Sequence, residues 1–479
     1  MGSLNCFIVP VESGEMPTRQ SPRVGKGAVG KRNRSWETPK HIVANMEVST
    51  IQERIADMAR RYPERGLTSL NRYLTEDWLK AAFDKVRKNA AAGVDGMIAR
   101  DYEEQMASRL PELVNLTHSG QYIAPPVRRT YIEKPGKSEK RPLGIPTVED
   151  KVLQRAVVML IEPIYEQEFY DFSYGFRPGR SAHDAIKALD NAVMSMGTGW
   201  ILDVDIRKFF DTLDHGHMQA FVRQRVRDGV LTRLIGKWLN AGVLEDGECR
   251  SNEYGTPQGG VISPLLANIY LHEVLDKWFA KDIQPRLRGR CFLIRYADDF
   301  VMGFERKEDA ERVLEVLPKR LGKYGLEIHA EKTRLVDFCR PRTDGPMRDH
   351  KAETFDFLGF THYWGISRNR QYYVMRHRTA KGRLKRALCA INQWCSKHRH
   401  DPLREQWKML NVKLKGHYGY YSISGNQLQV HVFREQVRRY WFKWLNRRHR
   451  RRNSLEWAAY EDLLKVFPLV TPYCVCKLY

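Results

Sequence analysis

The chain has few cysteines, and their spacing supports neither a zinc ribbon nor a redox motif. Eight cysteines are scattered over 479 residues, and no C-x-x-C pair occurs among them. Cys474 and Cys476 stand close together but lack partner ligands for a metal ion. We therefore expect reduced thiols, as in a cytosolic protein.

Long apolar runs are also absent. No stretch approaches the roughly 20 apolar residues that a membrane-spanning helix needs. The first ten residues lack the basic stretch and apolar run of a signal peptide. The sequence predicts a soluble, cytoplasmic protein with no membrane partner.

Acidic residues are too few to balance the basic ones. Lys and Arg number 80 against 57 Asp and Glu, which gives a formal charge of +23. Such a balance favours a polyanionic partner, because each neutralised phosphate releases bound counterions. A basic protein without a nucleic-acid role is the alternative. The length suits two or three domains, and 42% apolar residues allow a large core.

The residue pattern divides the chain into five segments. Residues 1–45 are rich in Gly, Pro, Ser and cations, which predicts a basic disordered tail. Helical spacing over 46–120 predicts a helical extension that leads into the next domain. Helices and short strands mix over 121–365, the segment 370–455 is helical and very basic, and 456–479 forms a short tail.

Two elements in the central segment are predicted with definite bounds. Residues 127–133 have the pattern of a strand, and a Pro-Gly turn follows them. Residues 149–161 have the pattern of a helix, which we expect to end just before Pro163.

Adjacent carboxylates at Asp298 and Asp299 are the most distinctive feature of the sequence. They lie in a turn between two segments, 291–296 and 300–304, that are expected to be strands. Adjacent acids repel each other, so such a pair usually needs a cation or full solvation. A solvated hairpin turn is the alternative, since Asp is common in turns.

A second acidic strand, 200–206, favours a metal site. Strand alternation places Asp203 and Asp205 on one face and the apolar residues between them on the other. Acids within an apolar strand are costly unless they are paired or bound to a metal. If the acidic segments lie side by side, three carboxylates converge, and hard oxygen ligands suit Mg²⁺.

At this point the sequence resembles a known family. Residues 296–299, with the sequence YADD, resemble the catalytic motif of reverse transcriptases in the form common to group II intron-encoded proteins. Asp205, followed five positions later by Phe210, resembles the first catalytic strand of that family. The resemblance implies that Asp205, Asp298 and Asp299 hold two Mg²⁺ ions, with Mn²⁺ as a substitute. Phe210 would exclude a ribose 2′-hydroxyl, with ordinary core packing as the alternative.

The glycine-rich stretch 255–269 resembles the template-handling motif of the same family. By that resemblance, Gln258 and Gly259 lie near the templating base and the incoming nucleotide. A glycine-rich loop that caps a helix is the alternative.

Two basic loops precede these motifs. Residues 131–146 resemble the fingers hairpin, which implies that Lys134 and Arg141 bind the triphosphate of a dNTP. Arg177 and Arg180 lie in a stretch similar to one typical of group II proteins, where they would meet template phosphates. Exposed basic turns are the alternative in both places.

Later motifs complete the resemblance. Lys332 lies in a stretch similar to a later palm motif, as a candidate general acid that protonates pyrophosphate, or as an ordinary surface lysine. Phe357, Leu358 and Gly359 resemble the primer grip, although a buried strand end would show the same pattern.

The C-terminal segment resembles the maturase, or X, domain. Tyr418 lies in its signature, and Arg447, Arg448, Arg450 and Arg451 follow a stretch of mixed aromatic and basic residues. Aromatic rings can stack on unpaired bases while cations bind phosphate. A solvated basic helix with its aromatic residues in a core is the alternative.

The resemblance covers about residues 50–450 and implies an α+β fold shaped as a right hand, with fingers, palm and helical thumb. It implies an RNA-directed DNA polymerase that is also a maturase. Its partners would be group II intron RNA, an RNA template, a DNA primer, dNTPs and target DNA. No endonuclease module follows the X domain, so the primer is expected to come from elsewhere. A splicing-only maturase and a reverse transcriptase domesticated for defence or repair are the alternatives.

Overall fold

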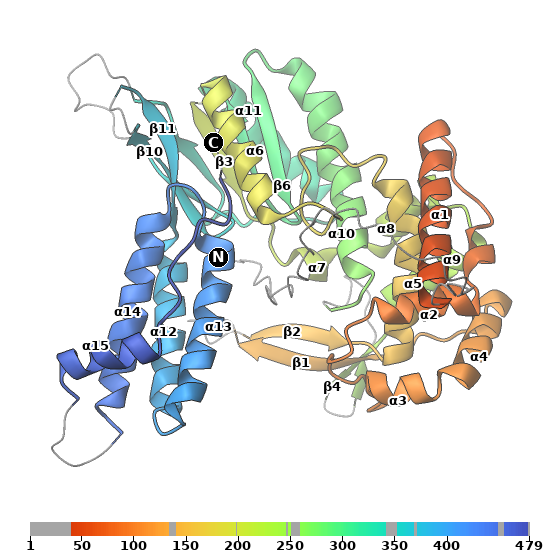
Figure 1. The fold of residues 1–479 in the computed structure, drawn as a ribbon. Helices are drawn as coiled ribbons and strands as arrows, with labels where there is room; N and C mark the ends of the chain where they lie inside the picture. The colour runs from red at the N-terminus through yellow and green to blue at the C-terminus, as the bar shows by residue number, and fades with distance from the viewer. Residues whose placement is uncertain are drawn as a thin grey trace, which may run out of the picture.

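The computed structural model describes residues 40–133, 140–197, 199–245, 248–250, 259–341, 352–367, 371–448 and 455–477. Helices and strands mix up to residue 379, and helices dominate beyond it, which confirms the α+β class. Figure 1 shows the C-terminal helices and the N-terminal helices on opposite sides of the molecule, with a β-hairpin reaching between them. Within the described residues, no helix has the length and apolar character needed to cross a membrane.

The N-terminal helices pack around one long buried helix. They are α1 (Lys40–Arg61), the 3₁₀ turn η1 (Leu70–Tyr73), α2 (Glu76–Asp84), α3 (Ala99–Glu104) and α4 (Met106–Ser119), and the buried helix is α5 (Val148–Tyr165). The Trp78 indole on α2 donates a hydrogen bond to the carbonyl of Ala156 on α5 at 3.0 Å. This contact joins the two helices inside the largest hydrophobic core.

Helix α5 continues past Pro163, so the helix end predicted there was wrong. Proline has no N–H, so it cannot donate to the carbonyl four residues earlier. That carbonyl belongs to Met159, and it accepts a hydrogen bond from the Gln52 side chain of α1 at 2.9 Å instead. Because a partner from another helix satisfies it, the last turn forms despite the proline.

A small sheet carries the hairpin between the two sides. Its strands are β1 (Val127–Glu133), β2 (Lys140–Ile145), β4 (Val243–Glu245) and β5 (Glu248–Arg250), in the order β2-β1-β4-β5. The pairing of β1 with β2 is antiparallel, and that of β1 with β4 is parallel. The bounds of β1 confirm the strand predicted at 127–133.

The central sheet is antiparallel and contains the acidic strands. Its strands are β3 (Trp200–Val204), β6 (Cys291–Tyr296), β7 (Asp299–Phe304) and β8 (Arg334–Asp337), in the order β6-β7-β3-β8. Helix α6 (Ala182–Met196) packs on the face that contains Ile201 and Val301. Helix α11 (Lys307–Gly322) packs on the other face, with Leu202 and Met302. Helices therefore cover both faces of the sheet, so a functional site can form only at the ends of its strands.

A run of helices connects β3 to β6. It consists of α7 (Phe209–Thr212), α8 (His215–Arg225), α9 (Gly229–Leu239) and α10 (Ser263–Leu271), and then the π-helical turns η2 (His272–Asp276) and η3 (Phe279–Ile283) and the 3₁₀ turn η4 (Gln284–Arg286). From α10 to η3 the helix is buried among the core residues beneath the sheet. Wider π turns rotate the following side chains relative to a regular helix, and they are frequent near functional sites.

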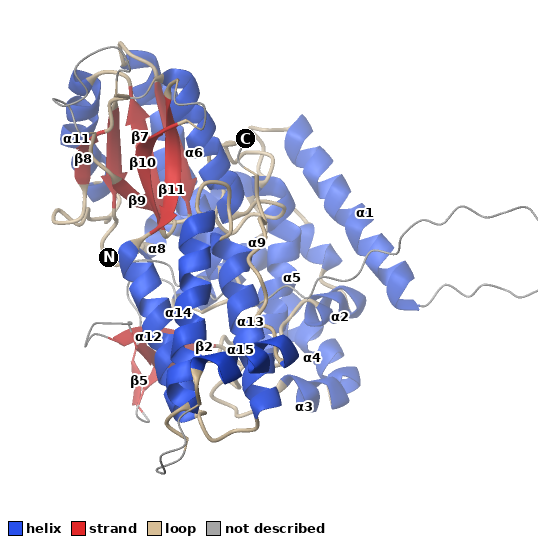
Figure 2. Ribbon diagram, turned by 60° about the vertical axis from the view of Figure 1, so that its left-hand side comes forward, coloured by secondary structure: helices blue, strands red, loops and turns tan. Residues whose placement is uncertain are grey.

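A third sheet leads into the C-terminal helices. Strands β9 (Phe355–Phe357), β10 (Phe360–Ile366) and β11 (Tyr373–Thr379) pair antiparallel in the order β11-β10-β9, and they precede α12 (Lys381–Lys397), α13 (Leu403–Tyr421), α14 (Gln427–Leu445) and α15 (Trp457–Val466). These helices share a hydrophobic core of their own, separate from the cores on the two faces of the central sheet. Figure 2 shows the helices as a bundle below the strands.

Candidate active site

The turn between β6 and β7 presents the two adjacent carboxylates. Tyr296 pairs with Asp299 at the end of the hairpin, so Ala297 and Asp298 form its two-residue turn. Ala297 has φ of 57°, a left-handed conformation that costs energy for any residue except glycine. Gly175 lies against this turn, and a side chain there would overlap the backbone of Ala297. The surrounding loop thus holds the turn in a strained shape.

Strand β3 brings Asp205 beside this turn. Val204 pairs with Phe300 in the antiparallel register, so extending the ladder by one residue places Asp205 opposite Asp299. The backbone of Asp205 is fixed on its other side, where its carbonyl accepts a hydrogen bond from the amide of His329 at 2.8 Å. The acidic strands therefore lie side by side, as the predicted convergence of the three carboxylates requires.

Burial and repulsion between carboxylates both raise pKa values at the site, and burial is the larger cause. Burial, followed by the negative charges of Asp298, Asp205 and Asp203, raises the pKa of Asp299 well above its ordinary value. Burial also raises the pKa of Asp203 to about 7, against the influence of Arg334, whose Nη2 lies 3.7 Å from its carboxylate. Such a set of anions is stabilised by a cation.

Lys332 supplies one positive charge at this position. Its Nζ lies 2.6 Å from Oδ2 of Asp205. Burial alone would lower the pKa of Lys332, but the hydrogen bond and charge of Asp205, together with Asp299, raise it. The lysine is therefore protonated at neutral pH and offsets part of the negative charge of the site.

The donor set fits divalent magnesium. Asp205, Asp298 and Asp299 offer only hard carboxylate oxygens, which Mg²⁺ prefers, and burial together with the charges of Asp298 and Asp205 raises the pKa of Asp299. In the described structure, the carboxylate oxygens of these three residues do not all lie within 4.8 Å of one another. Two ions about 4 Å apart would use such a wider set as a clamp.

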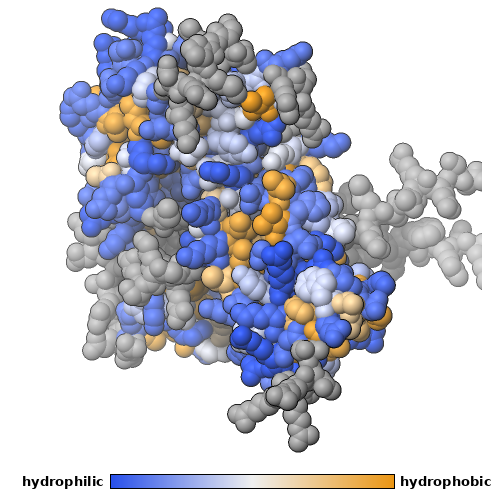
Figure 3. Space-filling model, turned by 90° about the vertical axis from the view of Figure 1, so that its left-hand side faces the viewer, coloured by the Kyte–Doolittle hydropathy of each residue, from blue (hydrophilic) through white to orange (hydrophobic). Residues whose placement is uncertain are grey.

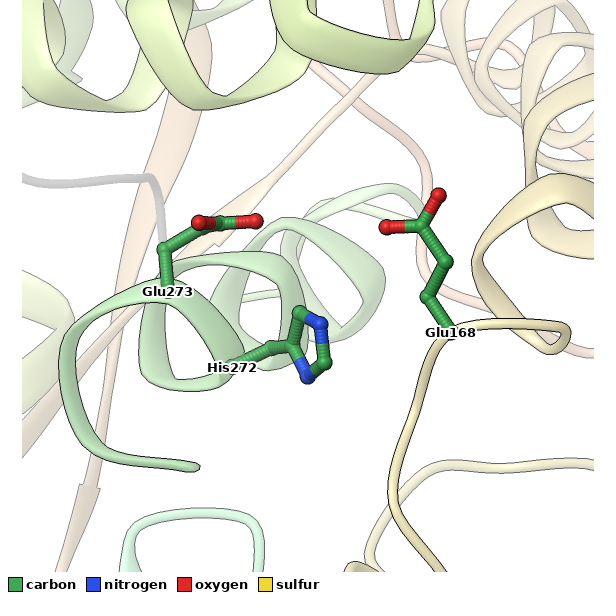
Figure 4. Close-up of side chains that lie close together, drawn as sticks. All are labelled: Glu168, His272 and Glu273. Atoms are coloured by element: carbon green, nitrogen blue, oxygen red, sulfur yellow. The ribbon is translucent and has the colours of Figure 1, made fainter. Parts of the chain in front are cut away.

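The one closed cluster in the described part of the chain lies elsewhere, at Glu168, His272 and Glu273. Figure 4 shows the two carboxylates facing each other beside the imidazole ring. Glu168 forms an ion pair with Arg225, and Glu273 forms one with Lys277 at 2.5 Å. Both carboxylates are already neutralised, so we interpret the cluster as an ion-pair network beneath the sheet.

Phe210 and Gly259 both lie against other parts of the described chain. Phe210 is buried on α7, where its ring meets that of Phe209 edge-on at 5.3 Å. Gly259 has φ of 118°, and a Cβ there would lie 2.5 Å from the carbonyl oxygen of Gly144 in β2. Only glycine permits this close approach between residue 259 and strand β2.

Three of the expected substrate-binding side chains lie outside the described part of the chain. Lys134 and Gln258 lie outside the described residues. Arg141 pairs with Ile132 in the β1–β2 ladder, and its side chain lies outside the described part of the chain. These assignments stay predictions.

Arg177 does not have the role expected from the sequence. Its guanidinium is buried and forms hydrogen bonds with the Glu166 carboxylate and with the carbonyls of Tyr170 and Ser173. With its donors used inside the loop, this arginine shapes the protein and is not exposed to a template phosphate. Arg180 lies nearer the surface, but it pairs with Asp171 at 2.7 Å.

The expected primer-grip turn joins β9 to β10 in the third sheet and contacts the C-terminal helices. Phe357 is buried, whereas Leu358 and Gly359 form a turn with φ of 48° and 81°. The carbonyl of Leu358 accepts a hydrogen bond from the hydroxyl of Tyr420 at 2.7 Å. The carbonyl of Gly359 accepts one from the amide of Ala380 at 3.0 Å. The turn is thus fixed from the helical side.

The C-terminal contacts divide into buried and exposed groups. Tyr418 is fully buried, and its hydroxyl donates to the carbonyl of Val470 at 3.2 Å, so it belongs to the core and not to an RNA surface. Arg447 lies over the Trp444 ring at 5.2 Å, and Arg448 donates to the carbonyl of Asp401 at 2.8 Å.

Arg450 and Arg451 lie outside the described residues. Figure 3 looks onto the side of the C-terminal helices and shows mostly hydrophilic side chains around small apolar patches.

Sequence reasoning missed two cations at the site. Arg383, in the first turn of α12, offsets part of the rise in the pKa of Asp299. Nothing in the local pattern of α12 indicates that proximity. Arg295 lies within apolar strand β6 and is fully buried. The rule that a charge in an apolar strand needs a partner, applied above to Asp203, would have singled it out.

Comparison with known proteins agrees with the motifs. Residues 132–362 match the family model described as reverse transcriptase (RNA-dependent DNA polymerase). The chain is 33% identical over 305 residues to the group II intron-encoded protein LtrA of Lactococcus lactis subsp. cremoris, an alignment that covers 61% of this chain and 51% of that protein.

It is 34% identical over 324 residues to protein YkfC of Escherichia coli K12, covering 60% of this chain and 85% of that protein. A shorter alignment, 34% identical over 137 residues, matches nuclear intron maturase 3 of Arabidopsis thaliana, with 28% of this chain and 18% of that protein covered. The chain thus spans about half the length of the LtrA protein that it matches.

Proposed function

Because the chain belongs to the family of group II intron-encoded reverse transcriptases and maturases, we propose that it copies RNA into DNA. The substrates are dNTPs, an RNA template and a DNA primer. The observation that carries the proposal is the placement of Asp205 opposite Asp299, at the end of adjacent strands and next to Asp298.

The protein contributes charge and position to the reaction. Asp205, Asp298 and Asp299 would hold two Mg²⁺ ions, which lower the pKa of a primer 3′-hydroxyl and stabilise the departing pyrophosphate. Lys332, held protonated by Asp205, would give a proton to that leaving group. Phe210, which is buried on α7, would exclude a ribose 2′-hydroxyl.

The overall shape supports a right-hand arrangement. The N-terminal helices with the β1–β2 hairpin serve as fingers, the central sheet as palm, and α12–α15 as thumb, with the hairpin lying between the two helical sides (Figure 1). A polymerase of this form grips the template-primer duplex between thumb and fingers. The segment boundaries of the sequence analysis stay predictions.

We also propose that the thumb region acts as a maturase that binds group II intron RNA and assists its splicing, in support of intron mobility into target DNA. Exposed cations beside aromatic rings support this role, as where Lys443 and Arg447 both approach Trp444. Cations of this kind bind phosphate while rings stack on bases.

Primer extension on poly(rA)/oligo(dT) tests the polymerase. We expect dTTP incorporation that requires Mg²⁺ and stops when EDTA is added. Glu308→Gln, which removes an exposed carboxylate on α11, should leave the activity unchanged. No Mg²⁺-dependent incorporation by the wild-type protein would favour the alternative of a splicing-only RNA-binding maturase.

A further inference from the structure

Arg295 is a fully buried cation directly behind the catalytic turn. Its guanidinium forms a two-point ion pair with Asp276, with Nε to Oδ1 at 2.8 Å and Nη2 to Oδ2 at 2.5 Å. Neither side chain is exposed to solvent. The pair is short and two-pointed, which is the geometry that distinguishes arginine from lysine as a fixed donor.

The remaining nitrogen of Arg295 reaches the turn itself. Nη1 donates to the carbonyl of Ala297 at 3.1 Å and to Oδ1 of Asn268 at 3.0 Å. The amide nitrogen of Asn268 in turn donates to the carbonyl of Gly175 at 2.6 Å. Gly175 is the residue whose lack of a side chain lets the loop approach Ala297.

The backbone of Arg295 joins the same loop. Its amide donates to the carbonyl of Phe172 at 2.9 Å, and its carbonyl accepts from the amide of Tyr174 at 2.8 Å. The helix through α10 and η2, the loop before α6 and strand β6 therefore meet at one guanidinium.

The position of this contact determines what it controls. The carbonyl of Ala297 belongs to the peptide that leads into Asp298, so fixing it fixes the direction of the following residue. Ala297 is in a left-handed conformation, which would relax if its carbonyl lost this partner. A small rotation of that peptide would move the carboxylates of Asp298 and Asp299 relative to Asp205.

We propose that Arg295, held by Asp276 and Asn268, is a positioning residue that fixes the catalytic turn and thereby sets its affinity for divalent cations. The inference rests on the proposed function for its catalytic consequence, but cation binding can be measured by itself. Groups that orient metal ligands typically change metal affinity by about 10- to 100-fold when removed.

Two variants test the inference. Asn268→Ala removes the bridge between Arg295 and Gly175 while keeping the ion pair, so the fold should survive. Arg295→Lys keeps the charge but loses the planar two-point geometry. For both we expect Mn²⁺ binding, followed by electron paramagnetic resonance, to weaken by about tenfold. The Mg²⁺ concentration for half-maximal extension should rise in proportion, with little change in KM for template-primer.

Arg225→Lys is the matched control. Arg225 is also a buried arginine paired with a carboxylate, that of Glu168, and it also bonds backbone carbonyls, including that of Ala59. It makes no contact with the turn in these bonds. We expect this control to lower the thermal midpoint while Mn²⁺ affinity stays within about twofold of wild type.

The outcome is decided by Mn²⁺ affinity compared with thermal stability. Unchanged Mn²⁺ affinity in Asn268→Ala, with activity falling only as stability falls, would show that Arg295 is merely structural. If Arg295→Lys does not fold, Asn268→Ala alone decides. A wild-type protein that binds Mn²⁺ but does not extend a primer would refute the proposed polymerase and leave the positioning test intact.

Discussion

At the scale of single residues, the contact between Lys332 and Asp205 links two predicted roles. The ammonium lies 2.6 Å from a carboxylate oxygen that is also an expected metal ligand. If Asp205 holds a metal ion, the ion would compete with Lys332 for this oxygen. Under the proposed function, Lys332 would then have two roles, as a counter-charge to Asp205 and as the acid that protonates pyrophosphate.

Lys332→Met separates these roles. Without its competing charge, we expect the Mg²⁺ concentration for half-maximal extension to fall or stay constant. The kcat should fall by about 10²- to 10⁴-fold if the lysine is the general acid. Primer extension over a range of Mg²⁺ concentrations measures both quantities. A kcat equal to that of wild type would remove Lys332 from the chemistry.

His272 predicts an acid-sensitive fold. Burial, followed by the positive charges of Lys277 and Arg295, lowers its pKa from 6.5 to about 2. Below pH 6.5 the histidine binds a proton in the unfolded chain but stays neutral in the folded one. The free energy of unfolding therefore falls as the pH drops below 6.5. At pH 5 the loss should be about 2 kcal/mol.

Urea unfolding at pH 7.5 and pH 5 measures this loss. His272 packs between the rings of Phe169 and Tyr170, with centroids 5.4 Å and 5.6 Å away, so His272→Phe should fit the site. The free energy of unfolding of the variant should decline less on acidification than that of wild type. Equal declines would show that another group controls the acid response.

The sequence predicted the charged residues whose unfavourable placement is visible from their neighbours in the chain. The Asp205 and Asp298 segments stood out because carboxylates next to apolar strand residues need a reason, and alternation is visible in sequence. The partners of Arg295 did not, because Asp276 and Asn268 lie on a helix whose packing no local pattern reveals. Arg177 was misassigned for the same reason, since its partner Glu166 is set by how a loop folds back.

At the scale of elements, the turn at Leu358 and Gly359 joins β9 to β10 and contacts the C-terminal helices. Behind it, the buried rings of His362 and His377 lie with their Nδ1 atoms 2.9 Å apart, and Nε2 of His362 lies 3.3 Å from the carbonyl of Phe357. The turn is thus supported from the sheet as well as from α12. Its rigidity suits a segment that seats a primer end.

Gly359→Ala tests the turn. Gly359 has φ of 81°, and an added Cβ would lie 3.2 Å from the hydroxyl of Tyr421. We expect a loss of about 1 kcal/mol in the free energy of unfolding and a higher KM for template-primer. An unchanged KM, with stability lost, would remove the turn from primer binding.

Gly382→Ala is the paired control. Gly382 lies in α12, and an added Cβ would meet no atom within 4 Å. Alanine should stabilise this helix by about 0.5–1 kcal/mol, because glycine loses more backbone entropy on folding. Urea unfolding measures both glycine variants in the same experiment.

Element boundaries were predicted where periodicity governs them and missed where a distant partner does. Strand β1 matches its prediction, and β6 and β7 fall where the apolar segments indicated. Helix α5 outlasts its prediction because Gln52, more than a hundred residues away, satisfies the carbonyl that Pro163 cannot. The π turns after α10 have no sequence signature that we applied.

At the scale of the whole molecule, the charge of +23 is the feature that composition alone revealed. The arrangement of the fold, a central sheet with helices on two sides, depends on tertiary packing, which no local sequence pattern encodes. The family resemblance supplied that arrangement in advance, as an expectation of a right hand.

Arg447→Ala tests the basic thumb surface. Arg447 lies over Trp444, and its loss should weaken RNA binding and reduce the slope of log affinity against log salt by about one unit. Fluorescence anisotropy with a structured RNA over a salt series measures the slope. Arg290→Ala, which removes a cation paired with Glu305 beside the central sheet, is the control and should change it less. Equal slopes for Arg447→Ala and wild type would remove this residue from the interface.

The most direct test of the three-carboxylate site is Asp298→Ala, assayed for primer extension and for RNA affinity in the same preparation. Extension should fall by at least about a hundredfold, because the site loses a metal ligand, while RNA affinity stays near that of wild type. Extension by Asp298→Ala at the wild-type rate would contradict the assignment of the metal site.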